Sequence, residues 1–193
     1  MAVELSARDG ALLVAQLERR VGDAVRIEAG AWTYTAAFNA LDQFDVAGMP
    51  LLIHGNSGLY GLVEGKLLAT PHSEEGGLSG WTRVGVANGD INRVNSYLGA
   101  GLVYTGLVPG RDKDQAGVAI ARAGIGAPAR QAAQLRGVAL GDNETTLEAT
   151  YRYVLTEWLN IQPDIQYVIH PGGDRAVDNA VVVGFRLAFT ASR

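Results

Sequence analysis

Hydrophobic and polar residues alternate with a period of two along most of the chain. The clearest case runs from Glu144 to Tyr153, where Thr, Leu, Ala, Tyr and Tyr occupy one side and Glu, Thr, Glu, Thr and Arg the other. Such alternation predicts β-strands, because successive side chains of a strand point to opposite faces of a sheet. Nine alternating runs can be marked in this way: residues 11–20, 24–35, 57–69, 78–88, 96–108, 116–123, 143–155, 158–170 and 179–190.

Most of these runs are ten to thirteen residues long. Strands of globular proteins have about five or six residues, whereas a tilted strand needs about nine to eleven to cross a bilayer. The length therefore favours an all-β fold, an antiparallel transmembrane β-barrel whose apolar row faces lipid and whose charged row lines a wet interior. The alternative is a soluble β-barrel or sandwich that binds a small ligand, or a lectin-like module. It predicts that Leu147, Tyr151, Ile165 and Phe185 are buried by protein.

The connections between the runs differ in length. Three residues separate runs one and two, and only the short turn at 156–158 joins runs seven and eight. About twenty residues separate runs two and three, and runs six and seven. Tight turns at one end and long loops at the other are typical of bacterial outer-membrane barrels. We therefore predict that residues 36–56 form a long loop that folds inward as a constriction. One helical turn is expected around residues 128–136.

Composition excludes several classes of function. A net charge of −4 without a basic run argues against a protein that binds nucleic acid through phosphate contacts. The absence of cysteine excludes disulfides, thiolate chemistry and Cys-bound metals. Glycine is abundant, at 25 residues, although it is disfavoured in ordinary strands. In a wide barrel, glycine on the inner face would leave room for water.

No pattern of catalytic or metal-binding residues is found in the sequence. The segment Gly124–Ala129 matches G-x-G-x-x-A, but Pro128 falls in what would be the first helical turn and no α/β alternation surrounds it. His54, His72 and His170 lie in or beside three different connections without a second ligand nearby. We therefore predict that the protein is not an enzyme and has no cofactor or metal.

Several segments resemble the carbohydrate-selective porins of the OprB family. The segment ETTLEATYRYVLTEWLNIQPDIQYVIHPGG, Glu144 to Gly173, resembles their closing hairpin, with E-x-x-x-E-x-x-Y, W-L-x-x-Q-P-D-x-Q-Y and x-P-G-G in order. The segments GNSGLYGLVEGKLL (55–68) and GLVYTGLVPGRDKD (101–114) are similar to the same family, the latter through G-x-x-x-T-G-L-x-P-G-R-x-x-D. The resemblance implies a sixteen-stranded outer-membrane barrel of Gram-negative bacteria that passes sugars by passive diffusion. Residues 1–193 would form a single porin domain, the C-terminal half of that barrel.

The number of runs agrees with a half barrel. Complete single-chain barrels have an even number of strands, whereas nine runs are found here. The first ten residues, MAVELSARDG, lack the basic start and apolar region of a signal peptide, as we expect of a C-terminal fragment. The expected partners are sugars, outer-membrane lipid, and either a missing N-terminal half or further copies in a homo-oligomer. A half-length remnant without conductance is a further alternative.

The alternation of side chains along each run, called strand parity below, predicts the residues that would line the pore. Sugars carry many hydroxyls and have apolar ring faces, so a selective pore needs charged planar groups and aromatic faces. Arginine is suited to this role because its guanidinium stays charged and presents a fixed fork of donors. The candidates are Arg26, Glu28, Trp32, Glu64, Lys66, Trp81, Arg83, Glu148, Arg152, Asp164, Gln166 and Arg186.

Four aromatic residues are predicted to form part of an interfacial girdle. Tyr151, Tyr153, Trp158 and Tyr167 flank the short connection at 156–158. Tyrosine and tryptophan gather where a membrane meets water, because each ring has an apolar body and a polar atom.

Overall fold

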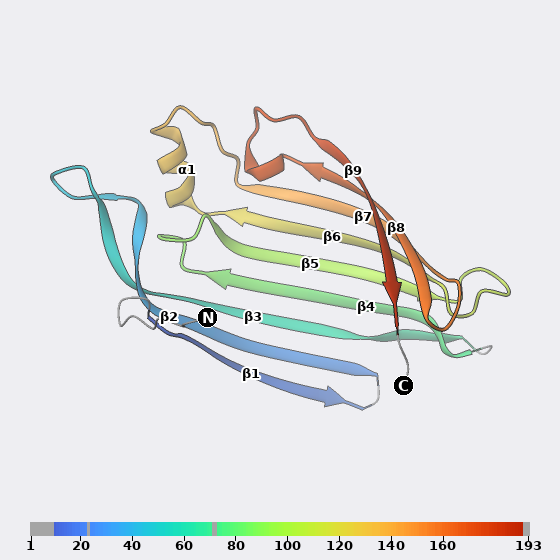
Figure 1. Cartoon of the computed structure of the whole chain (residues 1–193). Coiled ribbons are helices and arrows are strands. Elements are labelled where there is room, and N and C mark those ends of the chain that lie inside the picture. Colours follow the sequence, from blue (N-terminus) through green and yellow to red (C-terminus); the bar gives the residue numbers. More distant parts are fainter. Residues whose placement is uncertain (1–9, 23, 71–72, 191–193) are drawn as a thin grey trace, which may run out of the picture.

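The computed structural model of the chain describes residues 10–22, 24–70 and 73–190. In these ranges the chain forms one antiparallel sheet in the order β1 to β9, so that every strand pairs with its neighbours in sequence (Figure 1). The predicted all-β antiparallel fold is confirmed. The strands are β1 (Leu12–Val21), β2 (Val25–Phe44), β3 (Pro50–Thr70), β4 (Ser73–Ala87), β5 (Val94–Thr105), β6 (Gln115–Ile125), β7 (Asn143–Val154), β8 (Leu159–Ile169) and β9 (Ala180–Phe189). A helix, α1 (Ala127–Gln134), and a 3-10 turn, η1 (Pro171–Gly173), lie in two of the connections.

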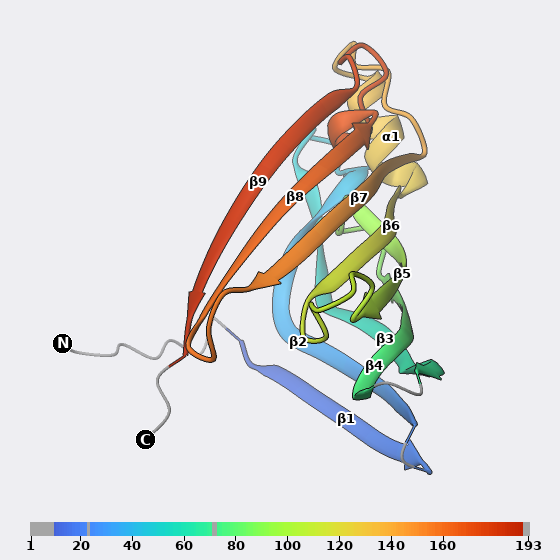
Figure 2. The same ribbon diagram turned by 90° about the vertical axis from the view of Figure 1, so that its right-hand side faces the viewer.

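The sheet is a single curved layer with two rims. Figure 2 shows it as a trough whose wall runs from β9 through β5 to β1. The C-terminal rim is the edge at which β1, β3, β5, β7 and β9 end. The helix rim is the opposite edge, at which β2, β4, β6 and β8 end and α1 lies. Among the described residues, no helix has the length and hydropathy needed to span a membrane.

The sheet encloses no dry core. No large side chain of the described residues is fully buried, and most of the buried apolar residues are alanines. Leu147, Ile165 and Phe185 are 43%, 50% and 65% exposed. A sandwich would bury these residues beneath a second layer, so the burial that the soluble alternative predicts is wrong.

The strands match the nine alternating runs, but residues 36–56 differ from the prediction. They continue β2 to Phe44 and begin β3 at Pro50, so that only residues 45–49 connect the two strands. Asp45 closes this turn, because its Oδ1 accepts hydrogen bonds from the backbone N–H groups of Ala47 and Met49 at 2.8 and 2.9 Å. The predicted long loop is therefore wrong. His54, expected in or beside a connection, lies within β3, and His72 lies outside the described residues.

The outer part of the β2–β3 hairpin, residues 36–54, is called the arm, and it reaches toward α1. Two register shifts interrupt its pairing, one after Tyr34 with one extra residue on β2 and one after Asn39 with three, and such bulges bend a strand. The Leu41 N–H donates to the carbonyl oxygen of Asp90 in the β4–β5 connection at 2.8 Å. Helix α1 contacts β2, in which Ala40 is buried, although α1 follows β6 in the chain. The arm thus joins two distant connections at the helix rim.

Helix α1 is longer than the single turn expected around residues 128–136. It begins at Ala127, and Pro128 lies in its first turn, where a missing N–H costs no hydrogen bond. Ala129, Ala132 and Ala133 form its buried side. The helix therefore packs through small side chains.

Candidate solute-lining surface

The strand register divides the sheet into a polar and an apolar face. Glu64 pairs with Arg26 on one side and with Trp81 on the other, and paired residues share a face. The register continues from Trp81 across β5 and β6 to Glu148, so the same face extends over the whole sheet. All twelve predicted residues lie on this polar face. They are Arg26, Glu28 and Trp32 on β2, Glu64 and Lys66 on β3, Trp81 and Arg83 on β4, Glu148 and Arg152 on β7, Asp164 and Gln166 on β8, and Arg186 on β9.

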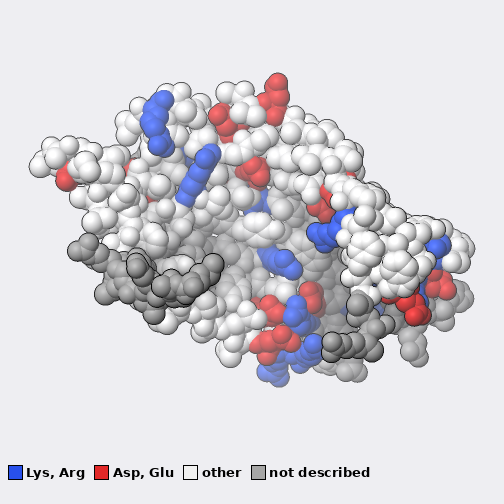
Figure 3. Space-filling view, viewed as in Figure 1, with Lys and Arg blue, Asp and Glu red and all other residues white. Residues whose placement is uncertain are grey.

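The polar face is the inner face of the trough. Figure 3, viewed into the trough, shows Lys, Arg, Asp and Glu side chains across its inner surface. On β8, Asp164 and Gln166 are half-buried, whereas Ile165 and Tyr167 are exposed. A soluble protein shows the opposite distribution, because its apolar side chains face a core. Sheltered polar residues behind an exposed apolar face are typical of a transmembrane barrel wall.

Two tryptophans on the polar face lie flat over glycines. A Cβ atom added at Gly58 would lie 2.6 Å from the Trp32 indole, and one at Gly101 would lie 2.6 Å from the Trp81 indole. Because each glycine has no side chain, the ring rests against the backbone instead of projecting into the trough. Each indole therefore presents an apolar face to solvent without filling the lumen.

Tyr60 is a polar-face residue that strand parity could have identified. It lies four residues before Glu64 in β3, and its hydroxyl donates to Gln16 Oε1 at 2.7 Å. Its ring covers Gly30 as the indoles cover their glycines. Tyr97 of β5 shares the polar face as well. The abundance of Gly in the central runs obscured their register in the sequence.

Arg26 is the centre of a charge cluster on β1 to β3 in which carboxylates outnumber cations. Its guanidinium lies 2.8 Å from Glu64, 2.5 Å from Glu28 and 3.4 Å from Glu18. Three carboxylates therefore share one guanidinium, and its donors are directed at protein acceptors. Glu18 was not among the predicted residues, although it has the parity of the polar positions in the first run.

The polar residues of β7 to β9 form a second group with a different arrangement. Gln166 Nε2 donates to Glu148 at 2.9 Å, and Gln162 Nε2 donates to Thr150 Oγ1 at 3.0 Å. Arg152 Nε is buried and has no hydrogen-bond partner within the described residues. The two groups therefore differ in whether their cations are satisfied by the protein. No group of three His, Asp or Glu in the described ranges could hold a metal ion.

A family comparison identifies the class of protein to which this wall belongs. The model of the family described as "Carbohydrate-selective porin, OprB family" matches residues 6–190. The chain belongs to the OprB family. Porin B of Pseudomonas aeruginosa strain PAO1 is 29% identical over 164 residues, which cover 74% of this chain and 36% of the relative. The chain thus spans about a third of the length of that relative.

Solved structures have the same fold. The high pH structure of Pseudomonas putida OprB aligns with a TM-score of 0.84 and 25% identity over 94% of this chain and 49% of that chain. The low pH structure aligns with a TM-score of 0.55 and 21% identity over 91% of this chain and 54% of that chain. The sheet of this OprB-family chain therefore matches about half of a porin barrel.

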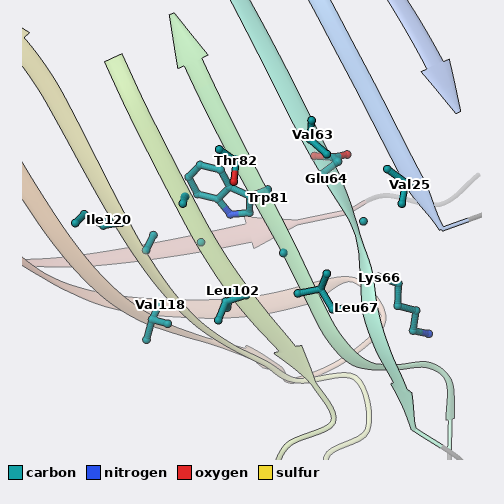
Figure 4. Close-up of a pocket in the computed structure, with 15 residues that line it drawn as sticks. Val25, Val63, Glu64, Lys66, Leu67, Trp81, Thr82, Leu102, Val118 and Ile120 are labelled. Atoms are coloured by element: carbon teal, nitrogen blue, oxygen red, sulfur yellow. The ribbon is translucent and has the colours of Figure 1, made fainter. Parts of the chain in front are cut away.

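The outer face of this OprB-family sheet contains a shallow apolar groove of about 570 Å³ across β3 to β6 (Figure 4). Gly80 lies in its lining, and Leu67 and Leu102 pack close to this glycine, because a Cβ added there would lie 3.0 and 3.2 Å from them. The groove is continuous with the apolar face, and Glu64, Lys66 and Trp81 of the polar face also contribute to its lining. Other side chains that line it are Val63, Val118 and Ile120.

The four predicted girdle residues lie at two rims. Tyr151 and Tyr153 lie near the C-terminal end of β7, and Trp158 stacks on Phe189 at 6.3 Å between ring centroids. These residues are at the C-terminal rim. Tyr167 lies near the other end of β8, toward the helix rim, so its predicted place beside the 156–158 connection is wrong. Tyr167 follows Leu159, the first residue of β8, by eight residues, and at the rise of a strand this distance carries it close to the opposite rim.

A buried carboxylate fastens the β5–β6 connection to β7, and this group is called the Asp114 clasp. Asp114 is 2% exposed and accepts hydrogen bonds from Arg111 Nε, Arg111 Nη2, the Tyr151 hydroxyl and the Val154 N–H, all at 2.8 Å. Burial alone would raise the pKa of Asp114, but these hydrogen bonds together hold the pKa below its ordinary value of 3.8. The Arg111 guanidinium also lies 3.7 Å from the centre of the Tyr153 ring. Arg111 and Asp114 are the R-x-x-D of the segment that resembles the family.

Proposed function

We propose that this chain forms part of the wall of an outer-membrane channel through which sugars diffuse passively. The observation that carries the proposal is the inverted exposure of the two faces, with sheltered polar residues inside and exposed apolar residues outside. Membership of the OprB family supports sugars as the solutes and a channel rather than an enzyme. The apolar outer face would contact the lipid of the outer membrane.

The inner face offers both kinds of contact that a sugar needs. Glu148, Gln166 and the other polar-face residues supply donors and acceptors for hydroxyl groups. Trp32 and Trp81 supply flat apolar surfaces for the faces of the sugar ring. The twelve polar-face residues are proposed to line the path, with weak contacts that release the solute again.

The arm and α1 are proposed to narrow the channel mouth at the helix rim. The arm leaves the plane of the wall at its bulges and is fixed by the Leu41 hydrogen bond and by contact with α1. This replaces the long inward loop that the sequence predicted with a bent hairpin. Deleting the turn residues 45–49 would test whether the arm limits the flow of sugar.

A closed wall requires strands beyond β1 and β9. Each of these strands pairs on one side only in the described structure, and an unpaired edge in lipid leaves backbone groups without partners. We propose that further strands complete the barrel, either from an N-terminal half of a longer protein or from other copies in a homo-oligomer. Residues 1–193 would then be one part of a single porin domain.

Planar-bilayer recording with graded glucose tests the proposal. The current should fall with rising glucose, and Trp81→Ala should weaken this block about two- to tenfold, because one aromatic contact is lost. Trp158→Ala is the matched control, since Trp158 lies at the C-terminal rim and stacks on Phe189. A current that does not respond to glucose, or no current at all, would support a remnant without conductance and contradict the proposal.

A further inference from the structure

The cations of the polar face fall into two classes, and the difference indicates a binding site. Arg26 is surrounded by Glu18, Glu28 and Glu64. Within the described residues, Arg152 and Lys113 have no carboxylate within ion-pair distance. A cation that the protein itself neutralises has little capacity for an anionic solute, whereas an unneutralised cation beside a cavity retains that capacity.

Arg152 and Lys113 line the same cavity at the C-terminal rim. The cavity measures about 480 Å³, within the range of roughly 300–1,000 Å³ that small-molecule sites occupy. Arg152 Nε is buried and has no hydrogen-bond acceptor among the described residues. Buried donors are normally paired, so this donor indicates a missing acceptor.

The other groups around the cavity are suited to hydroxyl groups rather than to apolar atoms. Gln115 donates to Thr105 Oγ1 at 3.2 Å on one side, and Asn160 and Thr156 face it from the β7–β8 hairpin. These neutral amides and hydroxyls both donate and accept, as a polyol requires. The only carboxylate in the lining is Glu157, so two cations oppose one anion.

The neighbouring strand adds a third positive charge at the same level. Gln162 lies opposite Arg186 on β9, and the β7–β8 register sets Arg152 opposite Gln162 on the other side. The Arg186 side chain has no hydrogen bond or ion pair in the part of the chain that the structure describes. The cations of β7 to β9 at the C-terminal rim therefore lack the carboxylate partners that surround Arg26.

We propose that this cavity binds a sugar acid, a polyol that carries a carboxylate, as the solute passes the C-terminal rim. The proposal rests on the proposed channel function and adds a substrate class to it. The guanidinium of Arg152 would take the carboxylate through its paired N–H donors, with Lys113 as a second charge. Gln115, Asn160 and Thr156 would take the hydroxyl groups.

Gluconate titration of the purified chain in detergent, followed by saturation-transfer NMR, tests the site directly. Glucose and inorganic phosphate are the comparison probes, since one lacks the charge and the other lacks the polyol. Arg152→Gln should weaken gluconate binding about tenfold, because a charged hydrogen bond is lost, and should weaken glucose binding by a much smaller factor, because glucose has no carboxylate. Glu157→Gln should strengthen gluconate binding about two- to threefold. The matched control is Arg136→Gln, which removes an exposed cation near α1 at the opposite rim.

Three results would overturn the assignment. One is gluconate binding that does not change in Arg152→Gln, and another is an equal loss in Arg136→Gln. The third is phosphate binding as tight as gluconate binding, which would indicate a simple anion site. Glucose block in planar bilayers separates the two proposals. If gluconate binding depends on Arg152 but no glucose block occurs, the channel function fails and the site stands; if glucose blocks and Arg152 is without effect, the site alone fails.

Discussion

Asp114→Asn is the substitution that most directly tests what holds the C-terminal rim together. Asparagine has the shape of aspartate, but an NH₂ group replaces one of two oxygens that each accept two hydrogen bonds in the Asp114 clasp. The new donors would face existing donors, so two hydrogen bonds are lost. The groups left without a partner are buried, which adds to the destabilisation.

The size of the effect follows from these bonds. A hydrogen bond to a charged group contributes roughly 1.5–3 kcal/mol, and breaking a buried charged pair costs about 3–5 kcal/mol. The Arg111 side chain is 29% exposed, so water replaces part of what it loses. We expect the free energy of unfolding to fall by about 3 kcal/mol, at the lower end of that range. With an m-value of about 2 kcal/mol per M, the urea midpoint would fall by about 1.5 M.

The assay is urea unfolding of the chain in detergent micelles, followed by tryptophan fluorescence and circular dichroism. Asp112→Asn is the matched control, because Asp112 lies in the same connection but is exposed. It should change the free energy of unfolding by no more than about 0.5 kcal/mol. Equal shifts for the two variants, or no shift for Asp114→Asn, would refute the view that the clasp stabilises the sheet.

Three further predictions concern pH, packing and charge. The lowered pKa of Asp114 means that the stabilisation by its charge is complete above pH 3.8 and is lost as the pH falls through the lowered pKa. The urea midpoint should therefore decrease below pH 3.8 more steeply in the wild type than in Asp114→Asn. Parallel curves of midpoint against pH would contradict this. Gly101→Val should displace the Trp81 indole, lower the free energy of unfolding by about 1–3 kcal/mol and weaken glucose block. Gly85→Ala, whose Cβ would have no neighbour nearer than 3.7 Å, should change neither, and equal effects in the two variants would argue against the packing explanation. Arg26→Gln removes the cation shared by Glu18, Glu28 and Glu64, of which only Glu18 keeps another partner, Arg20. It should shift the reversal potential in a KCl gradient toward cation selectivity, and an unchanged potential would show that this cluster does not face the ion path.

The strands that were predictable from the sequence are those whose alternation is strict. The runs 143–155 and 158–170 agree with β7 and β8 within one residue. The same parity placed all twelve charged, polar and aromatic candidates on one face, because the side-chain period of a strand is two. The arm was missed for a physical reason. The two register shifts add one and three residues to β2, so the alternation in residues 36–44 changes phase at each.

The Asp114 clasp and the Arg152 cavity could not be predicted from local patterns. Asp112 and Asp114 look alike in the sequence, and both belong to a polar connection of the kind that normally faces solvent. The partners Tyr151 and Val154 follow about forty residues later. Only the pairing of β6 with β7 brings them within hydrogen-bonding distance of Asp114.

The nearest-neighbour order of the strands has a consequence for how such a wall is made. Every strand pairs only with the strand before or after it, so each hairpin is completed as soon as its second strand is in place. Assembly can then proceed by stepwise addition at a growing edge, without a crossing that must wait for a distant segment. For the same reason, duplication of a hairpin would enlarge the circumference of the barrel and leave the existing strand pairs intact. The pore diameter can therefore change in evolution without a change in the pairing of the other strands.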